Sequence, residues 1–223
     1  MTRFNPRKHT AAFASATGRA LFAASLSRMK TPLDRERTAL LIMDYQVGIL
    51  GGLGAEAEAL LARAQDVLAA ARRATLPIIY VKVCFRPGHP EIGTGNVRLT
   101  ELKEAGRFVS GAPDTEIHRT VTPQRTDLVV MKRRVSAFAG SDLEVILRAR
   151  RIETLVLFGV ATSGVVLSTV RQAADADYRL IVVGDCCGDR DAEVHRVLLE
   201  KIIPRQAEVA SAAELVAGLA ATQ

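Results

Sequence analysis

The chain has 223 residues, 48% of them hydrophobic, which is enough for one α/β domain with a full core or for two small domains. Six of its 30 Lys and Arg residues lie in residues 1–30, which contain no acid, so the other 24 are balanced by 24 acidic residues. A neutral body with 4% aromatic residues and no tryptophan is unlike a nucleic-acid-binding protein. No apolar run approaches the ~20 residues of a membrane span, so we expect no membrane as partner. Because of the neutral body and the few aromatic residues, we also expect no nucleic acid as partner.

The first 30 residues are rich in arginine, serine and alanine and lack acids. This composition is typical of an organellar transit peptide. Two other interpretations stay open: a disordered basic arm, and an upstream start codon before a shorter protein that begins at Met29. We expect residues 1–30 to form an arm outside a single domain that spans residues 31–223.

From residue 38 onward, short β-branched apolar runs alternate with longer amphipathic segments. The runs predict strands at 39–43, 77–84, 127–131, 154–158, 179–183 and 207–210. The segments predict helices at 55–74, 142–150, 164–176, 191–203 and 212–221. Near-continuous apolar strands that alternate with helices are typical of a parallel sheet covered on both faces. The expected fold class is therefore α/β, a three-layer α/β/α domain with a six-stranded, mainly parallel sheet.

The longest irregular stretch is 85–120, which holds five prolines and glycines in its first eleven residues and more beyond. A loop of this length in a compact domain is usually functional, as a lid or as a subunit contact. A surface excursion without chemistry is the alternative.

The chain has three cysteines, Cys84, Cys186 and Cys187, and no C-x-x-C pair. An odd count without framework spacing, in which two members are adjacent and cannot readily bridge each other, argues against a disulfide scaffold. The cysteines therefore indicate a reducing, cytoplasmic compartment.

Three predicted strands end in a reactive or special group. Asp44 follows the first predicted strand, Lys132 follows the third, and the turn GVATSGVV at 159–166 follows the fourth. Ligands of parallel sheets bind beyond the carboxyl ends of the strands, so these groups should face one rim. A carboxylate and an ammonium in one cleft shift each other's pKa, which indicates a hydrolytic site. A structural ion pair, or two unrelated surface charges, are the alternatives.

Four segments together resemble the isochorismatase-like superfamily, whose members are often called cysteine hydrolases. They are ALLIMDYQ (39–46), VMKRRVSAF (130–138), LVLFGVAT (155–162) and VVGDCC (182–187), and the resemblance covers nearly all of 38–215. It implies a Rossmann-like strand order. It also implies that Asp44 is a proton shuttle and that Lys132 orients or polarises the reacting group.

The resemblance further implies a substrate pocket and a backbone feature. The residues expected to line the pocket are Gln46, Ser136, Phe138, Val160, Ala161, Thr162, Ser163, Gly164 and Val165. A cis peptide is implied between Val160 and Ala161. The turn also starts a helix near Gly164, where free backbone N–H groups are a ready cradle for an anion.

One position departs from the family pattern. The family turn usually reads G-V-x-T-x-x-C-V, so Val165 stands where the nucleophilic cysteine belongs, and valine has no lone pair to attack with. Isochorismatases themselves carry glycine there and hydrolyse a vinyl ether without a covalent intermediate, so a retained acid can suffice. We therefore expect a hydrolase that acts on a small organic substrate through Asp44 and Lys132, without a cysteine nucleophile.

Two alternatives stay open: a non-catalytic ligand-binding or regulatory protein on the same scaffold, and a cysteine hydrolase (amidase) that uses a displaced thiol. Arg86, Arg133 and Arg134 lie near the expected rim, where they either hold a substrate carboxylate or are solvated charges. His89 has no aspartate nearby of the kind that binds metal in nicotinamidase relatives, so we expect neither metal nor cofactor. The resemblance implies a homo-oligomer, a dimer or tetramer.

Overall fold

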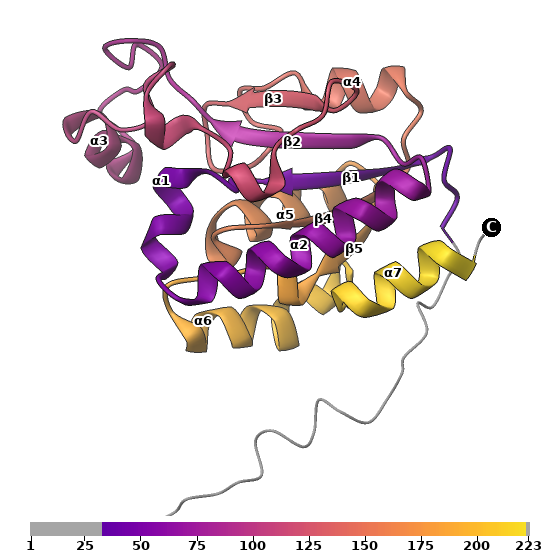
Figure 1. Ribbon diagram of the computed structural model, residues 1–223. Helices are drawn as coiled ribbons and strands as arrows, with labels where there is room; N and C mark the ends of the chain where they lie inside the picture. Colours follow the sequence, from indigo (N-terminus) through magenta and orange to yellow (C-terminus); the bar gives the residue numbers. More distant parts are fainter. Residues whose placement is uncertain (1–32, 222–223) are drawn as a thin grey trace, which may run out of the picture.

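Six strands form the centre of the computed structural model, which describes residues 33–221 (Figure 1). The strands are β1 (Thr38–Met43), β2 (Ile78–Val83), β3 (Leu128–Lys132), β4 (Thr154–Gly159), β5 (Arg179–Val183) and β6 (Glu208–Ala210). Their order in the sheet is β3-β2-β1-β4-β5-β6, and all five pairings are parallel. The predicted α/β class and Rossmann-like order are confirmed. The arm predicted for residues 1–30 lies outside the described residues and stays a prediction.

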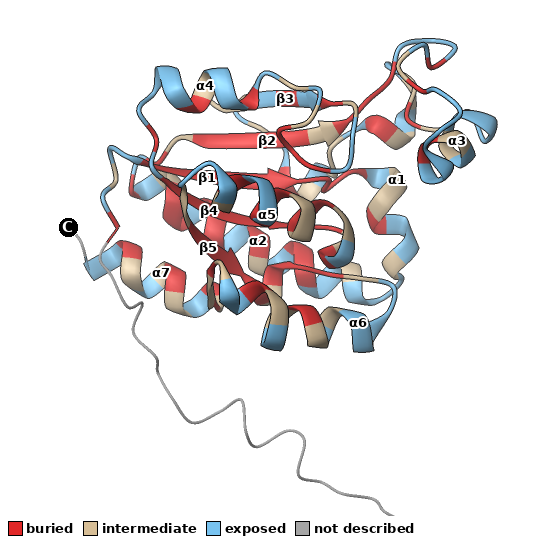
Figure 2. Cartoon of the chain, turned by 180° about the vertical axis from the view of Figure 1, so that it is seen from behind, coloured by how far each residue is buried: buried red, intermediate tan, exposed pale blue. Residues whose placement is uncertain are grey.

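The helices lie on both faces of this sheet. They are α1 (Val47–Leu50), α2 (Glu56–Arg73), α3 (Val97–Glu104), α4 (Leu143–Ala149), α5 (Leu167–Asp175), α6 (Ala192–Val197) and α7 (Ala212–Ala221). Helices α2 and α7 lie side by side on one face, and α5 lies on the other (Figures 1 and 2). None of the described helices is long and apolar enough to cross a membrane.

Strands β1 and β4 are buried along their whole length, because each is flanked by a strand on both sides and by helices on both faces (Figure 2). Their unbroken apolar sequences follow from this position. Strand β3 is an edge strand and alternates instead, with Val129 and Met131 exposed. Strand position therefore explains why the runs of β1 and β4 are apolar throughout.

Helix α2 shows how local sequence sets the ends of an element. Its first turn carries Glu56 and Glu58, and its last turn carries Arg72 and Arg73, which matches the helix dipole at both ends. The predicted apolar stripe is buried against the sheet: Leu60, Leu61, Ala64, Val67, Leu68 and Ala71. The boundaries agree with the predicted helix to within one residue.

The connection from β2 to β3 differs from the expected irregular stretch. It contains α3 and two short 3₁₀ turns, Pro113–Thr115 and Arg119–Val121. It also has a small apolar cluster of its own: Val83, Phe85, Ile92, Leu99 and Phe108. The sequence did not predict helix α3, because this helix buries only Leu99 and so has no apolar stripe. The connection projects beyond the carboxyl ends of β2 and β3 (Figure 1).

Candidate active site

Asp44 and Lys132 meet at the carboxyl edge of the sheet. Asp44 directly follows β1 and Lys132 is the last residue of β3, with β2 between the two strands. Lys132 Nζ lies 2.9 Å from Asp44 Oδ2, and the two side chains are 3% and 7% exposed. The expected convergence of the two groups is confirmed, and both are removed from bulk water.

The two carboxyl oxygens of Asp44 have different surroundings. Oδ2 accepts from Lys132, whereas Oδ1 is buried and has no hydrogen-bond partner among the described residues. Burial raises the pKa of the Asp44 carboxyl above its usual value, and the nearby Lys132 ammonium offsets this only in part. The site therefore favours an Asp44 that holds a proton more tightly than an exposed aspartate does.

The backbone around Asp44 is fixed by β2. Asp44 has a φ of 58°, and its N–H donates to Val81 O at 2.8 Å. Two residues later, the fully buried Gln46 side chain bonds both main-chain groups of Val83 and donates to Thr115 O at 3.1 Å. Both amide protons of Gln46 thus form hydrogen bonds within the protein. The side chain therefore links β2 to the 84–127 connection.

Lys132 is held by the segment that follows it. Its ammonium donates to Arg134 O at 3.1 Å, so the chain after β3 curls back over its own last residue. The three rim arginines are engaged as well. Arg86 and Arg133 contact Glu91 Oε1 at 2.7 and 3.3 Å, and Arg134 donates to the carbonyl of Glu91.

The turn after β4 brings Val165 to the same edge. The peptide between Val160 and Ala161 is cis, as the resemblance implied, and residues Thr162–Val166 form a π-helical turn before α5. Val165 is 2% exposed, and its Cγ1 lies 3.2 Å from the place where a Cβ at Gly159 would be. Gly159 pairs with Met43, the residue before Asp44, so the valine side chain packs at the ends of β1 and β4.

Most backbone amides of this turn are already bonded within the protein. Thr162 N–H donates to Gly188 O, Ser163 N–H to Asp189 Oδ2, and Gly164 N–H to Ala161 O, at 2.8, 2.7 and 3.1 Å. A ligand would have to displace an internal acceptor to reach these three amides, and the expected anion cradle stays a prediction.

Two of the expected pocket residues make their contacts elsewhere. Ser136 donates to Gln172 Oε1 on α5 at 2.7 Å, and the Phe138 ring lies 6.0 Å from the ring of Tyr178. Tyr178 immediately precedes β5, at the amino edge of the sheet, whereas Asp44 lies at the carboxyl edge. These contacts hold the segment between β3 and α4 against α5 and the start of β5, and the expected pocket roles of Ser136 and Phe138 stay predictions.

A contact that the sequence did not suggest joins the turn to α6. Thr162 is fully buried, and its hydroxyl lies 2.8 Å from Nδ1 of His195 and 3.2 Å from Gly188 O. His195 is 33 residues away along the chain, so no local pattern links the two. Only the packing of α6 against the turn reveals it.

The three cysteines and His89 lie in buried surroundings, and Cys84 directly follows β2 at the same edge of the sheet, where its N–H donates to Lys132 O at 3.3 Å. Cys84, Cys186 and Cys187 are all buried and unpaired. His89 is buried, with Nε2 2.7 Å from Arg107 O. Within residues 33–221 no group of three or more His, Cys, Asp and Glu side chains is placed to hold a metal ion.

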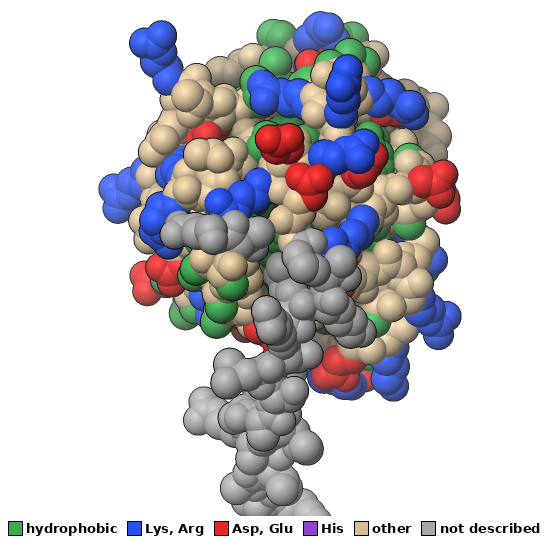
Figure 3. Space-filling view, turned by 90° about the vertical axis from the view of Figure 1, so that its right-hand side faces the viewer, with side chains coloured by type: hydrophobic (Ala, Val, Ile, Leu, Met, Phe, Trp, Pro, Cys, Tyr) green, Lys and Arg blue, Asp and Glu red, His purple; other side chains and the backbone are tan. Residues whose placement is uncertain are grey.

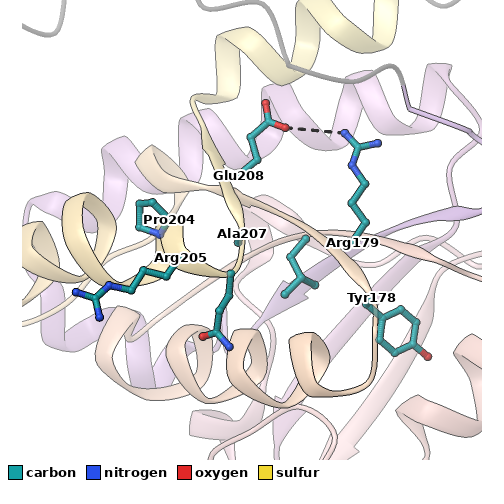
Figure 4. Close-up of a pocket in the computed structure, with 8 residues that line it drawn as sticks. Tyr178, Arg179, Pro204, Arg205, Ala207 and Glu208 are labelled. Atoms are coloured by element: carbon teal, nitrogen blue, oxygen red, sulfur yellow. Dashed lines mark ion pairs between the residues drawn. The ribbon is translucent and has the colours of Figure 1, made fainter.

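A surface cavity of about 360 Å³ lies at the opposite edge of the sheet, at the amino ends of β5 and β6 (Figure 4). Its lining includes the Arg179–Glu208 ion pair, with a separation of 3.9 Å. This part of the molecule carries basic and acidic side chains intermixed (Figure 3), which agrees with the neutral body inferred from the sequence. The cavity is open and far from Asp44 along the strands, so we do not assign the chemistry to it.

A Rossmann-ordered sheet with an acid and an amine at its carboxyl edge defines a class of small α/β hydrolases. The isochorismatase domain model matches residues 38–214, so the chain belongs to the isochorismatase family and is a hydrolase. The chain is 31% identical over 191 residues to the uncharacterised isochorismatase family protein YecD of Escherichia coli O157:H7, covering 84% of this chain and 98% of that protein.

Two further comparisons bear on the activity and on the fold. The chain is 29% identical over 177 residues to maleamate amidohydrolase of Pseudomonas putida, covering 78% of this chain and 82% of that protein. The crystal structure of a cysteine hydrolase from Pseudomonas syringae pv. phaseolicola superposes with a TM-score of 0.81 at 24% identity, covering 87% of this chain and 97% of that one. The latter similarity concerns the fold alone.

Proposed function

We propose that this isochorismatase-family hydrolase works without a cysteine nucleophile, with Asp44 as general acid and base and Lys132 as its electrostatic partner. Water is the nucleophile, and the substrate is a small organic molecule. The single observation that carries the proposal is the buried Asp44 carboxyl, whose Oδ1 has no partner among the described residues while Oδ2 is held by Lys132.

The raised pKa of Asp44 makes an acid-first reaction the natural one. Asp44 gives its proton to the substrate oxygen or nitrogen that will depart, which makes the neighbouring carbon more electrophilic. Water adds to that carbon and returns its surplus proton to Asp44. The C–O or C–N bond then breaks, and its electron pair stays on the departing oxygen or nitrogen, which leaves with the proton. Lys132 stabilises the Asp44 carboxylate each time it is deprotonated.

The names of relatives suggest which bond to test first. Maleamate amidohydrolase of Pseudomonas putida, and ureidoacrylate amidohydrolase of Methylobacterium radiotolerans at 30% identity over 192 residues, are both amidohydrolases. Small carboxamides and ureides are therefore the first substrates to try, and vinyl ethers are the second.

The environment of the three cysteines argues against a displaced thiol. A catalytic cysteine needs thiolate character and access to the substrate. Burial raises the pKa of the Cys187 thiol to about 12 and that of Cys186 further, and Cys187 donates to Val183 O. Cys84 is 2% exposed at the end of β2. The surroundings of Cys186 and Cys187 therefore do not favour a nucleophile, and Cys84→Ser tests the thiol at the end of β2.

The test combines turnover with alkylation. Activity on the substrate panel should survive iodoacetamide and should survive Cys84→Ser, Cys186→Ser and Cys187→Ser, while Asp44→Asn abolishes it. Val165→Cys is the matched reporter: a thiol placed there should make the protein sensitive to iodoacetamide. Loss of activity on alkylation of the unmodified chain would overturn the thiol-free mechanism. No turnover of any substrate by a protein that still binds a ligand would identify a binding protein instead.

We also propose that the chain is a cytoplasmic homo-oligomer. The edge strand β3 exposes Val129 and Met131, and the 84–127 connection exposes Val97, so apolar surface is available for a second copy. Free buried cysteines fit a reducing compartment. Light scattering of the full chain should give the mass of a dimer or tetramer, and a mass near the 24.0 kDa of one chain would contradict the proposal.

A further inference from the structure

His195 is connected to the candidate site through a single hydroxyl. Its Nδ1 lies 2.8 Å from Thr162 Oγ1, and Thr162 is 0% exposed. The same hydroxyl lies 3.2 Å from Gly188 O, which also accepts the Thr162 N–H at 2.8 Å. The carbonyl of Gly188 therefore holds both polar groups of Thr162, and His195 lies on the other side of the hydroxyl.

The hydroxyl has one proton and two neighbours, so its orientation depends on the imidazole. A carbonyl oxygen only accepts, whereas Nδ1 either donates or accepts according to the tautomer. If Nδ1 carries a proton, it donates to Thr162 and the hydroxyl donates to Gly188. If Nδ1 is bare, the hydroxyl turns to the ring, and Gly188 keeps only the amide bond of Thr162. His195 thus sets how firmly the turn is tied to residue 188.

The segment 188–191 joins the turn to α6 at several points. Gly188 N–H donates to Gly159 O at 3.4 Å, and Asp189 Oδ2 accepts the Ser163 N–H at 2.7 Å. Asp191 caps α6 by accepting the N–H groups of Glu193 and Val194. Helix α6 is therefore anchored close to the turn, and His195 lies one turn after its cap.

The contact between His195 and Thr162 bears on the chemistry because the turn also carries Val165. Val165 packs at Gly159, and Gly159 pairs with Met43, the residue directly before Asp44. A shift of the turn would therefore move one wall of the space around the Asp44–Lys132 pair. The charged groups that act on His195 are Asp189 in the 188–191 segment and Glu56 in the first turn of α2.

We propose that His195 is a positioning residue that, through the Thr162 hydroxyl, holds the turn 160–166 in the arrangement required for catalysis. Where activity is concerned, this inference rests on the proposed function. The state of the turn itself can be measured without any substrate.

The variants form two matched pairs. His195→Asn retains a hydrogen-bonding group near the position of Nδ1, whereas His195→Gln places its amide near the position of Nε2, away from Thr162. Thr162→Ser keeps the hydroxyl, whereas Thr162→Val removes it with little change in volume. Thr162→Val combined with His195→Ala completes a double-mutant cycle.

Amide hydrogen exchange of residues 160–166 in the substrate-free chain is the first measurement. Because one hydrogen bond is lost, His195→Ala and His195→Gln should speed this exchange roughly five- to tenfold, and His195→Asn should restore it. Thr162→Val should have the same effect, with no further increase in the double variant. Independent, additive effects of the two substitutions would overturn the inference, and so would unchanged exchange in His195→Ala.

The second measurement is kcat on a working substrate, together with the pKa of His195 followed by NMR. His195→Ala and His195→Gln should lower kcat more than they change KM, His195→Asn should recover it, and Thr162→Val should shift the His195 pKa. If the unmodified chain is active and all His195 variants have the same kcat, the role of His195 is refuted and the proposed function is not. Absence of turnover in the unmodified chain would refute the proposed function, and the exchange cycle would still decide the role of His195.

Discussion

Two pairs of opposite charges lie at opposite edges of the same sheet, and their surroundings differ. At the carboxyl edge, Asp44 and Lys132 are 2.9 Å apart and almost fully buried. At the amino edge, Arg179 and Glu208 are 3.9 Å apart beside an open cavity, with side chains that are 34% and 19% exposed (Figure 4).

The comparison shows that burial, rather than the presence of two charges, makes a pair chemically useful. A partly exposed pair is solvated and screened, and it contributes little to stability. A buried pair pays a large desolvation cost, which favours the neutral acid and shifts its pKa.

The largest expected effect is on activity. Asp44→Asn keeps the shape of the side chain but cannot release or accept the catalytic proton, so kcat/KM should fall about 10²–10⁴-fold. Glu208→Gln, the matching change at the amino edge, should leave kcat/KM unchanged. Steady-state kinetics on the same substrate checks both. Equal losses in the two variants would mean that the assignment of the site to the carboxyl edge is wrong.

The second prediction concerns stability. Lys132→Met leaves the Asp44 carboxylate buried without its partner, which should cost about 3–5 kcal/mol in the free energy of unfolding. The cost should be larger at pH 8 than at pH 5, because at the lower pH Asp44 relieves it by taking a proton. Arg148→Met breaks the exposed Arg148–Glu144 pair on α4 and should leave the free energy of unfolding almost unchanged. Urea unfolding at both pH values measures these differences.

The third prediction concerns two glycines, Gly159 at the start of the turn and Gly164 within it. A Cβ at Gly159 would lie 2.6 Å from Met43 O, so Gly159→Ala should push β4 away from β1 and cost about 1–3 kcal/mol. A Cβ at Gly164 would have its nearest neighbour at 3.8 Å, so Gly164→Ala should be tolerated. Thermal unfolding of both variants provides the comparison. A Gly159→Ala protein as stable as Gly164→Ala would show that the close approach of the strands is not needed.

The smallest expected effect is the pH dependence of stability. The folded state raises the pKa of Asp44 above its unfolded value of about 3.9, so the folded state binds this proton more tightly. The resulting stabilisation is complete below that value and is lost as the pH rises through the folded-state pKa. The difference in unfolding free energy between the unmodified chain and Asp44→Asn should therefore change with pH in this window. A difference that is constant with pH would contradict the raised pKa.

Local sequence patterns predicted much of the fold but failed where elements are short. The six apolar runs became six strands with boundaries within about one residue, because central strands of a parallel sheet must be apolar throughout. Helix α1 has four residues and α3 buries a single leucine, so neither has a periodic pattern to detect. The end of the 191–203 helix became a π-helical turn, Leu198–Ile202, which apolar spacing does not distinguish from an α-helix.

For the site, the sequence identified which groups converge and missed what they touch. Asp44, Lys132 and the 159–166 turn follow strand ends, and parallel strands bring such ends to one edge. The contacts of Gln46, Ser136 and Phe138 with Val83, Gln172 and Tyr178 were not indicated by the sequence, and the place of these three residues in a substrate pocket stays a prediction. The direction of a side chain depends on the neighbouring elements, which residue spacing does not describe.

The meeting of an acid with an amine followed from the sequence, because the direction of parallel strands determines which strand ends share an edge, whereas the order of the strands was implied by the family resemblance. The tertiary structure alone decided that the Asp44–Lys132 pair is buried, that Oδ1 of Asp44 has no partner among the described residues, and that His195 contacts Thr162. These properties depend on the packing of segments far apart in the chain, and packing sets the desolvation from which the chemistry follows.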